Sequence, residues 1–234
     1  RLEVEALVRA LDRNGLEVFA INITHPGLEI PAFYSIVPGA HFRERAVGAS
    51  VGMFSARFIT ENFNPVEALS RLEALEKALP GKYYTSFYKG LMKAALYDYP
   101  GAKSDFLAAL DRNPDRLNRT DIYSHLAACL KDMEDYTGSI QTCENGLEID
   151  CQRPDLYNTM GVCQFMLKAH QKAIDSFEKA LEVDPSLAIN YANIGSNYRE
   201  LGEPALAIEY YEMALKLDPS ITFARENIEK LKSL

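Results

Sequence analysis

The sequence predicts a mainly α-helical protein: an α-solenoid of stacked helical hairpins, preceded by a small α/β segment. Two observations predict the solenoid. The C-terminal half matches itself at an offset of 34 residues, and Pro or Gly recurs where successive helices would end. A third observation predicts the α/β segment, because residues 16–37 hold two runs rich in β-branched and aromatic residues around a loop with Pro and Gly.

The bulk composition limits the classes of partner. With 47% apolar and 25% charged residues, the chain has the composition of a soluble globular protein. Its net charge of −8 argues against a nucleic acid or a membrane as the partner, because both attract clustered Lys and Arg. No apolar run approaches the roughly 18 residues that would span a bilayer, and no signal peptide opens the chain. We therefore expect a cytoplasmic protein and, since the sequence begins with Arg1, a fragment of a longer one.

The cysteines are expected to be reduced thiols in helices or in a helix connection. They form no CxxC pair and lack paired ligand spacing, so we expect no metal site. These cysteines are Cys129, Cys143, Cys151 and Cys163.

Residues 1–62 predict a helix, two strands and a further helical stretch. The amphipathic run "EVEALVRALDRNG" predicts a helix that Gly15 ends. The runs "LEVFAINIT" and "PAFYSIVPG" predict strands on either side of the loop. Two strands alone are only marginally stable in water, so we expect them to need a partner sheet or packing against helices.

This order of elements, and above all the stretch from Ile30-Pro31 to Val37-Pro38-Gly39, resembles the C-terminal end of the YcaO domain. The resemblance implies that the intact protein uses ATP and Mg²⁺ to activate a peptide amide oxygen, giving azolines, thioamides or related products. In that family the glutamate-rich motifs that hold ATP and magnesium lie upstream of this segment. We therefore expect no catalytic residue and no cofactor in this chain, whereas the intact parent is a candidate YcaO-type enzyme.

Residues 63–82 are expected to form a connecting helix. The run "PVEALSRLEALEKAL" places Leu69, Leu72, Leu75 and Leu79 at helical spacing. Two acids three residues apart, Glu73 and Glu76, are expected to face solvent, as such pairs on helix surfaces usually do.

Residues 83–221 contain about four similar units. Five sets of residues align at the offset: Tyr123, Tyr157 and Tyr191; Ala127, Gly161 and Gly195; Ser139, Ala173 and Ala207; Cys143, Phe177 and Tyr211; and Gly146, Ala180 and Ala214. This pattern resembles the tetratricopeptide repeat, a pair of helices per unit. An earlier unit, around Gly90 and Phe106, is displaced by three extra residues near "RLNR".

The pattern also predicts how the units pack. Small residues such as Gly161 and Gly195 would let the two helices of a hairpin approach closely, while Phe177 and Tyr211 fill the remaining space. The sequences "VDPS" and "LDPS" are expected to end one helix and, through Asp or Ser, to cap the next. Residues 222–234 should form a solvating cap helix with Phe223 on its apolar side, because each hairpin leaves an apolar face uncovered.

By the same resemblance, the first helix of each unit lines a concave groove that binds a peptide or protein partner. The set of Lys and Asn residues that holds a terminal carboxylate in some family members is not reproduced, since only Asn158 and Arg199 fit it. The expected groove residues are Tyr84, Phe87 and Leu91, then Asp121, Ser124 and Lys131, then Asp155, Asn158, Val162 and Phe165, and finally Ala192, Asn193, Ser196 and Arg199.

The sequence thus favours a protein-interaction module at the C-terminus of a YcaO-like protein. Two alternatives belong to other classes. In one, the strands complete an ATP-using active site in the intact enzyme. In the other, the array is a dimerisation element without a separate ligand.

Overall fold

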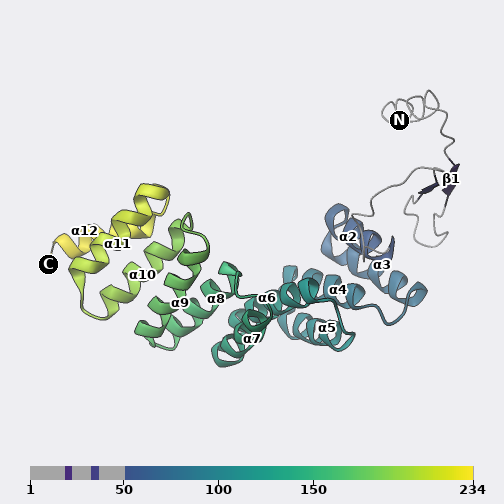
Figure 1. Cartoon of the computed structure of the whole chain (residues 1–234), viewed down its shortest axis with the longest axis horizontal. Coiled ribbons are helices and arrows are strands. Elements are labelled where there is room, and N and C mark those ends of the chain that lie inside the picture. The colour runs from purple at the N-terminus through teal and green to yellow at the C-terminus, as the bar shows by residue number, and fades with distance from the viewer. Residues whose placement is uncertain (1–18, 23–32, 37–50, 234) are drawn as a thin grey trace, which may run out of the picture.

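A computed structural model describes residues 19–22, 33–36 and 51–233 of the chain. In these ranges two strands are followed by eleven helices that extend into an elongated array (Figure 1). No helix in this part of the chain is long and apolar enough to cross a membrane. The elements are β1 (Phe19–Asn22), β2 (Phe33–Ile36), α2 (Val51–Asn62), α3 (Pro65–Ala78), α4 (Tyr83–Ala95), α5 (Tyr99–Asp111), α6 (Arg116–Asp132), α7 (Tyr136–Ile149), α8 (Pro154–Met166), α9 (His170–Val183), α10 (Ala188–Glu200), α11 (Pro204–Leu217) and α12 (Thr222–Lys232).

The two strands form an antiparallel pair. Phe19 lies opposite Ile36, and Asn22 opposite Phe33. Both strands fall within the two runs for which the sequence predicts strands. The other parts of the expected α/β segment lie outside the described residues: the helix that ends at Gly15, the loop, and most of the stretch that resembles the YcaO domain.

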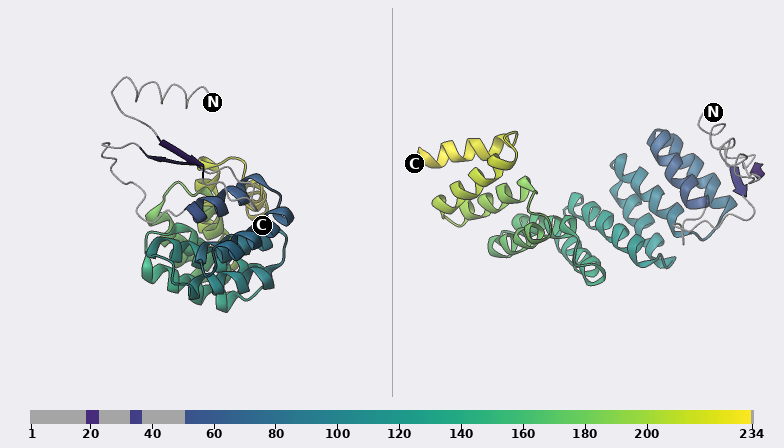
Figure 2. Two further views of the ribbon diagram at one scale, coloured as in Figure 1. Left: turned by 90° about the vertical axis from the view of Figure 1, so that its right-hand side faces the viewer. Right: turned by 45° about the horizontal axis from the view of Figure 1, so that its top comes forward.

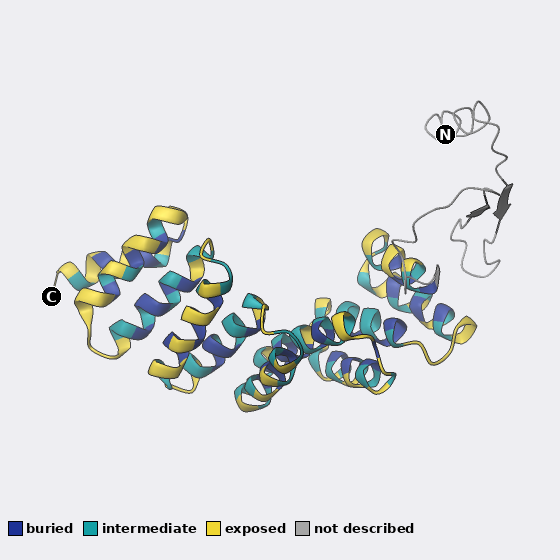
Figure 3. Cartoon of the chain, in the orientation of Figure 1, coloured by how far each residue is buried: buried dark blue, intermediate teal, exposed yellow. Residues whose placement is uncertain are grey.

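The helices pack as hairpins that stack in sequence order. Four hairpins, α4/α5, α6/α7, α8/α9 and α10/α11, follow one another, and the second helix of each contacts the first helix of the next. Figure 2 shows the same array turned, with α12 at its C-terminal end. Buried residues run along the inside of every pair (Figure 3). This is a mainly helical solenoid.

Helix α3 does more than connect two parts of the chain. It packs against α2 and α4, and the three helices share a core that includes Ile59, Leu72 and Tyr84. The expectation that Glu73 and Glu76 both face solvent is wrong for Glu76. Its carboxylate accepts hydrogen bonds from Lys89 at 2.9 Å and from Arg112 at 2.8 Å, so it ties α3 to α4 and α5.

Glycines let the two helices of a hairpin approach closely. A Cβ atom on Gly161 would lie 2.8 Å from the ring of Phe177, and one on Gly195 would lie 2.9 Å from the ring of Tyr211. Such contacts are too short for real side chains, so the aromatic ring and the glycine have to occur together. In the α4/α5, α8/α9 and α10/α11 hairpins the small and aromatic positions therefore form one packing unit, whereas α6/α7 has Cys143 at the aromatic position.

The extra residues near "RLNR" lengthen one helix. Helix α6 has 17 residues, whereas α4, α8 and α10 each have 13. The added turn starts after Asp115, whose side chain accepts a hydrogen bond from the backbone N–H of Asn118. Arg116 in this turn donates to the carbonyl of Ile149 at the end of α7. The insertion thus leaves the rest of α6 with the same residue positions facing its neighbours as in the other units.

The turns at "VDPS" and "LDPS" differ from the prediction. The residues that cap α10 and α12 are Leu187 and Ile221, and neither cap has a side-chain hydrogen bond. Asp184 instead accepts a hydrogen bond from the backbone N–H of Ser186, two residues later, and Asp218 stabilises its own turn in the same way. These acids therefore shape the connection rather than start the next helix.

Candidate functional site: the face of the first helices

The first helices of the four hairpins form one continuous face. Helix α4 contacts α6, α6 contacts α8, and α8 contacts α10. Every groove residue predicted from the sequence lies on one of these four helices. The face is filled differently at each of its three helix-to-helix junctions, and the last of them contains a pocket.

At the first junction, aromatic rings fill the space between α4 and α6. Phe87 lies 5.5 Å from His125, ring centre to ring centre, and Phe106 from α5 stacks on the same imidazole at 6.1 Å. Loss of hydration lowers the pKa of His125, although its ring still reaches solvent. A neutral imidazole is therefore favoured here.

At the second junction, an ionic cluster joins α6 to α8. The guanidinium of Arg153 donates to Asp121 at 2.7 Å and makes two bonds to Asp155, at 2.9 and 2.8 Å. Ser124 donates to Asp155 at 2.6 Å. Burial acts to raise the pKa of Asp155, and the bonds from Arg153 and Ser124 outweigh it, so the carboxyl group has a lowered pKa. Three predicted groove residues thus belong to one cluster, in which Asp121 and Asp155 are joined by an arginine that the sequence analysis did not select and Ser124 is bound to Asp155.

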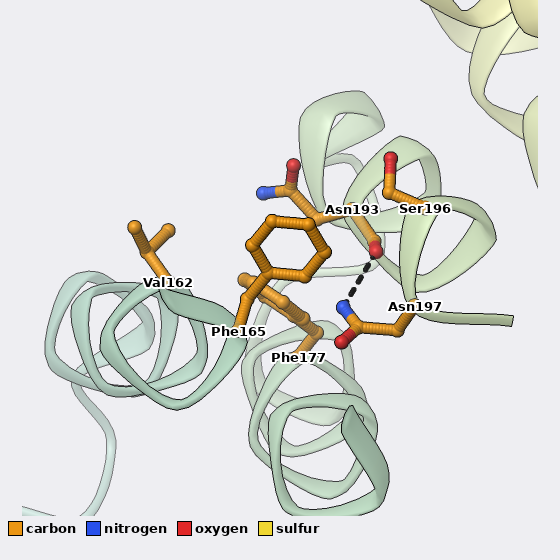
Figure 4. A pocket seen from close by; sticks show the side chains of 6 residues that line it. All are labelled: Val162, Phe165, Phe177, Asn193, Ser196 and Asn197. Carbon is orange, nitrogen blue, oxygen red and sulfur yellow. Dashed lines mark hydrogen bonds between the residues drawn. The ribbon is translucent and has the colours of Figure 1, made fainter. Parts of the chain in front are cut away.

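At the third junction, a pocket of about 120 Å³ opens between α8, α9 and α10 (Figure 4). Its apolar side is formed by two aromatic rings and a valine, and its polar side by two amides and a hydroxyl group. Four of the lining residues were predicted and two were not. The lining residues are Val162, Phe165, Phe177, Asn193, Ser196 and Asn197.

Two of the three polar side chains of the pocket already have hydrogen-bond partners among the described residues, and the third does not. Asn197 donates to the carbonyl of Asn193 at 2.8 Å, and its amide oxygen lies 3.1 Å from Nδ1 of His170. Ser196 donates to the carbonyl of Ala192 and accepts from the hydroxyl of Tyr211. Within the described part of the chain the side chain of Asn193 has no hydrogen bond, so its donors and its acceptor are free to bind a ligand.

The two pocket residues that the sequence analysis missed have different origins. Phe177 was assigned to packing, and it does pack on Gly161, but one side of its ring also lines the pocket. Asn197 takes the place of Cys129 and Cys163 in the two preceding units. That change from a thiol to an amide between aligned units was the sequence signal that could have identified Asn197 as a pocket residue.

The prediction that they line the groove is wrong for two residues. Tyr84 is only 5% exposed, because α2 packs over it and shares its core. Ala192 is fully buried among residues of α11 and α12, such as Tyr211 and Ala224. A ligand on the first-helix face cannot reach either side chain.

The predicted cations are already paired. Lys131 donates to Asp132 at 2.5 Å, and Arg199 donates to Asn227 and to Glu200, both at 2.6 Å. On α8, Asn158 has a buried amide oxygen without a hydrogen-bond partner among the described residues. The face therefore offers amide groups and apolar surface rather than unpaired positive charge.

Comparison with known proteins agrees with this architecture. A family model described as "Tetratricopeptide repeat" matches residues 157–220, from α8 to the end of α11. Tetratricopeptide repeats are recognised in this chain. The matched stretch contains every residue that lines the pocket. A search of the curated proteins finds no match to this sequence.

Several solved structures of repeat proteins superpose on the helical array. YrrB, a TPR protein with an unusual peptide-binding site, is 18% identical, covers 75% of this chain and 89% of its own, and has a TM-score of 0.64. MamA 41-end from Desulfovibrio magneticus RS-1 is 19% identical, covers 74% and 98%, and has a TM-score of 0.65. A thermophilic TPR protein in Thermus thermophilus is 15% identical, covers 78% and 98%, and has a TM-score of 0.58. At these identities the likeness shows the fold.

Proposed function

We propose that this chain is a protein-interaction module whose first-helix face binds a peptide segment of a partner protein. The observation that carries the proposal is the pocket between α8 and α10, where an apolar recess lies beside the free amide of Asn193. An apolar side chain of the segment would enter between Val162 and the two phenylalanines. The amide of Asn193 would pair with the backbone of the segment. The peptide-binding site named for YrrB supports this use of the fold.

The energetics favour an uncharged anchor. Burying one Leu, Met or Phe side chain contributes about 1.5–3 kcal/mol, and an amide–backbone hydrogen bond adds about 1 kcal/mol. Ion pairs should contribute little, because Arg199, the arginine on the same helix as Asn193, is already bound to Asn227 and Glu200. We therefore expect a partner segment internal to its chain, recognised by an apolar residue, with an affinity that varies little with salt.

The test first selects peptide ligands and then uses pocket variants to locate where they bind. Short peptides displayed on phage are selected against the chain, and their affinities are measured by fluorescence anisotropy with Asn193→Ala and with Val162→Glu. Selected peptides should share one apolar residue, and each substitution should weaken binding about tenfold, which corresponds to 1.4 kcal/mol.

The control is Lys172→Ala, which removes an exposed side chain on α9, away from the pocket. It should leave the affinity unchanged. Peptides that bind all three variants as tightly as the unaltered chain would show that the pocket is not the binding site.

The second candidate function is the enzymatic context that the resemblance of residues 2–62 implies. In that proposal the array presents a substrate protein to a YcaO-like domain that activates peptide amides with ATP. The stretch from Ile30 to Gly39 and the order of the strands support it. Calorimetry with Mg-ATP tests the role of this chain: no binding is expected here, and micromolar binding would make the chain itself part of a nucleotide site. For the dimerisation alternative, light scattering should give a monomer mass, and a dimer would favour that alternative.

A further inference from the structure

Helix α11 carries a row of large apolar side chains on its outer surface. Four positions spaced by four, three and four residues fall on one side of a helix. Leu206 is 37% exposed, Met213 39% and Leu217 51%. The fourth residue, Tyr210, is half-buried. These four residues are called the α11 stripe below.

The stripe is not required by the repeat. At the equivalent positions, 34 residues earlier, α9 has Lys172, Ser176, Lys179 and Val183. One unit further back, α7 has Gly138, Thr142, Asn145 and Ile149. The same fold thus accepts polar or small residues in place of Leu206, Tyr210 and Met213, whereas the position of Leu217 is apolar in all three units. Solvent-exposed apolar side chains gathered on one helix face indicate an interaction surface.

The residues beside the stripe make one edge of it acidic. Tyr210 stacks on Tyr198 at 5.3 Å and packs against the cluster that contains Ile174 of α9. The outer side of α9 exposes Asp175, Glu178 and Glu182. Partial burial raises the pKa of Glu178, and the charges of Asp175 and Glu182 raise it further.

Burial raises the pKa of the phenols of Tyr198 and Tyr210, and the nearby charge of Glu178 raises both further. The ammonium of Lys179 points elsewhere, 6.0 Å from the ring of Tyr157 on α8. Acidic side chains of α9 therefore lie beside the apolar row near Tyr210.

We propose that the outer surface of α9 and α11 docks an amphipathic helix of a partner protein, with apolar residues on one face and Lys or Arg along the adjacent edge. The apolar face would cover the α11 stripe, and the basic edge would meet Asp175, Glu178 and Glu182. The stripe covers eleven residue steps of a helix, about 16 Å, which matches roughly three turns of a docked helix. None of the residues of this surface lines the pocket beside α10, so the two sites are separate.

The test compares two model peptides on the intact chain. The first is a fluorescein-labelled helix with leucines on one face and lysines on the other. The second has the same pattern with Glu in place of every Lys. Fluorescence anisotropy should show that the Lys peptide binds at least about tenfold more tightly than the Glu peptide.

The informative variant is Leu206→Lys/Met213→Lys, which gives α11 the residues that α9 has at these positions and is therefore compatible with the fold. It should weaken binding of the Lys peptide at least about tenfold. Glu178→Lys should weaken it as well, while Asn193→Ala in the pocket should leave it unchanged.

Three outcomes would overturn the proposal. Equal binding of the two peptides would show that charge does not select the ligand. Unchanged affinity in the double variant would place the peptide elsewhere. Sedimentation that finds a dimer of the unaltered chain and a monomer of the double variant would show that a second copy covers the stripe.

Discussion

Asn190 shows how one residue can depart from the rules of its repeat. It is fully buried at the junction of α9 and α10, and within the described residues neither atom of its amide has a hydrogen-bond partner. The two preceding units have Leu156 and Ile122 at this position, both fully buried. Leaving a buried polar group without a partner costs about 1–3 kcal/mol. The unpaired amide therefore destabilises this junction relative to an apolar side chain at the same position.

Asn190→Leu should raise the free energy of unfolding by about 1–3 kcal/mol, because it removes the unpaired amide and places an apolar side chain where the second and third hairpins have Ile122 and Leu156. Urea denaturation measures the change. The matched control is Asn197→Leu on the same helix. Asn197 is equally buried, but its amide is bonded to His170 and to the carbonyl of Asn193, so this substitution should be destabilising. A loss of stability in Asn190→Leu would mean that its amide is satisfied in solution.

At the scale of the elements, the sequence predicted the helices well, because the spacing of aromatic, small and Pro residues repeats along the chain. It did not predict the chemistry of the groove to the same extent. Tyr84 is buried by α2, a helix that the repeat pattern does not include. The Arg153 cluster and the role of Asn197 depend on which side chains meet across neighbouring helices. A period of 34 residues assigns positions within one unit, but not the partners that each position meets.

The hydrogen bonds of Glu76 that tie α3 to α4 and α5 should make the stability of the chain depend on pH. Burial acts to raise the pKa of Glu76, and the hydrogen bonds from Lys89 and Arg112 outweigh it, so the folded-state pKa lies below the usual 4.5. A carboxylate with a depressed pKa stabilises the fold above its unfolded-state pKa, and the contribution is lost as the pH falls through the folded-state pKa.

Glu76→Gln should therefore lower the free energy of unfolding by about 1 kcal/mol at neutral pH. The difference from the unaltered chain should shrink as the pH falls below 4.5. Thermal denaturation at several pH values measures this. The control is Glu73→Gln, one turn away and exposed, which should have no effect at any pH. A difference for Glu76→Gln that stays constant down to acid pH would contradict the role of the ion pairs.

At the scale of the whole molecule, the core consists of separate clusters rather than one centre. Each cluster is shared by neighbouring helices, and the last one joins Ala192 and Tyr211 to Ile221, Ala224 and Ile228. In such an array, stability is close to a sum over units and their interfaces, and the terminal unit needs a polar outer surface. Helix α12 supplies that surface, because its buried side faces α11 and its charged residues face outward.

Deleting residues 222–234 should expose the apolar side of the α10/α11 hairpin, lower the melting temperature and cause aggregation. Circular dichroism and light scattering measure the two effects. Glu229→Ala, which changes an exposed residue of α12 and leaves the buried side intact, should behave like the unaltered chain. A truncated chain that stays monodisperse and equally stable would show that α12 is not a cap.

The extra turn at the start of α6 bears on how tandem arrays change length over evolutionary time. The added residues lie at the start of the hairpin, where Arg116 contacts Ile149. Because they precede the stacked part of α6, every later residue of the helix still faces the same neighbours. Three residues inserted in the middle of the same helix would rotate the following side chains by about 300°. That rotation would turn Ala127 away from Ser139, whose hydroxyl donates to the Ala127 carbonyl. Hairpin entrances are thus the places where a lineage can gain or lose residues while selection still preserves the stack.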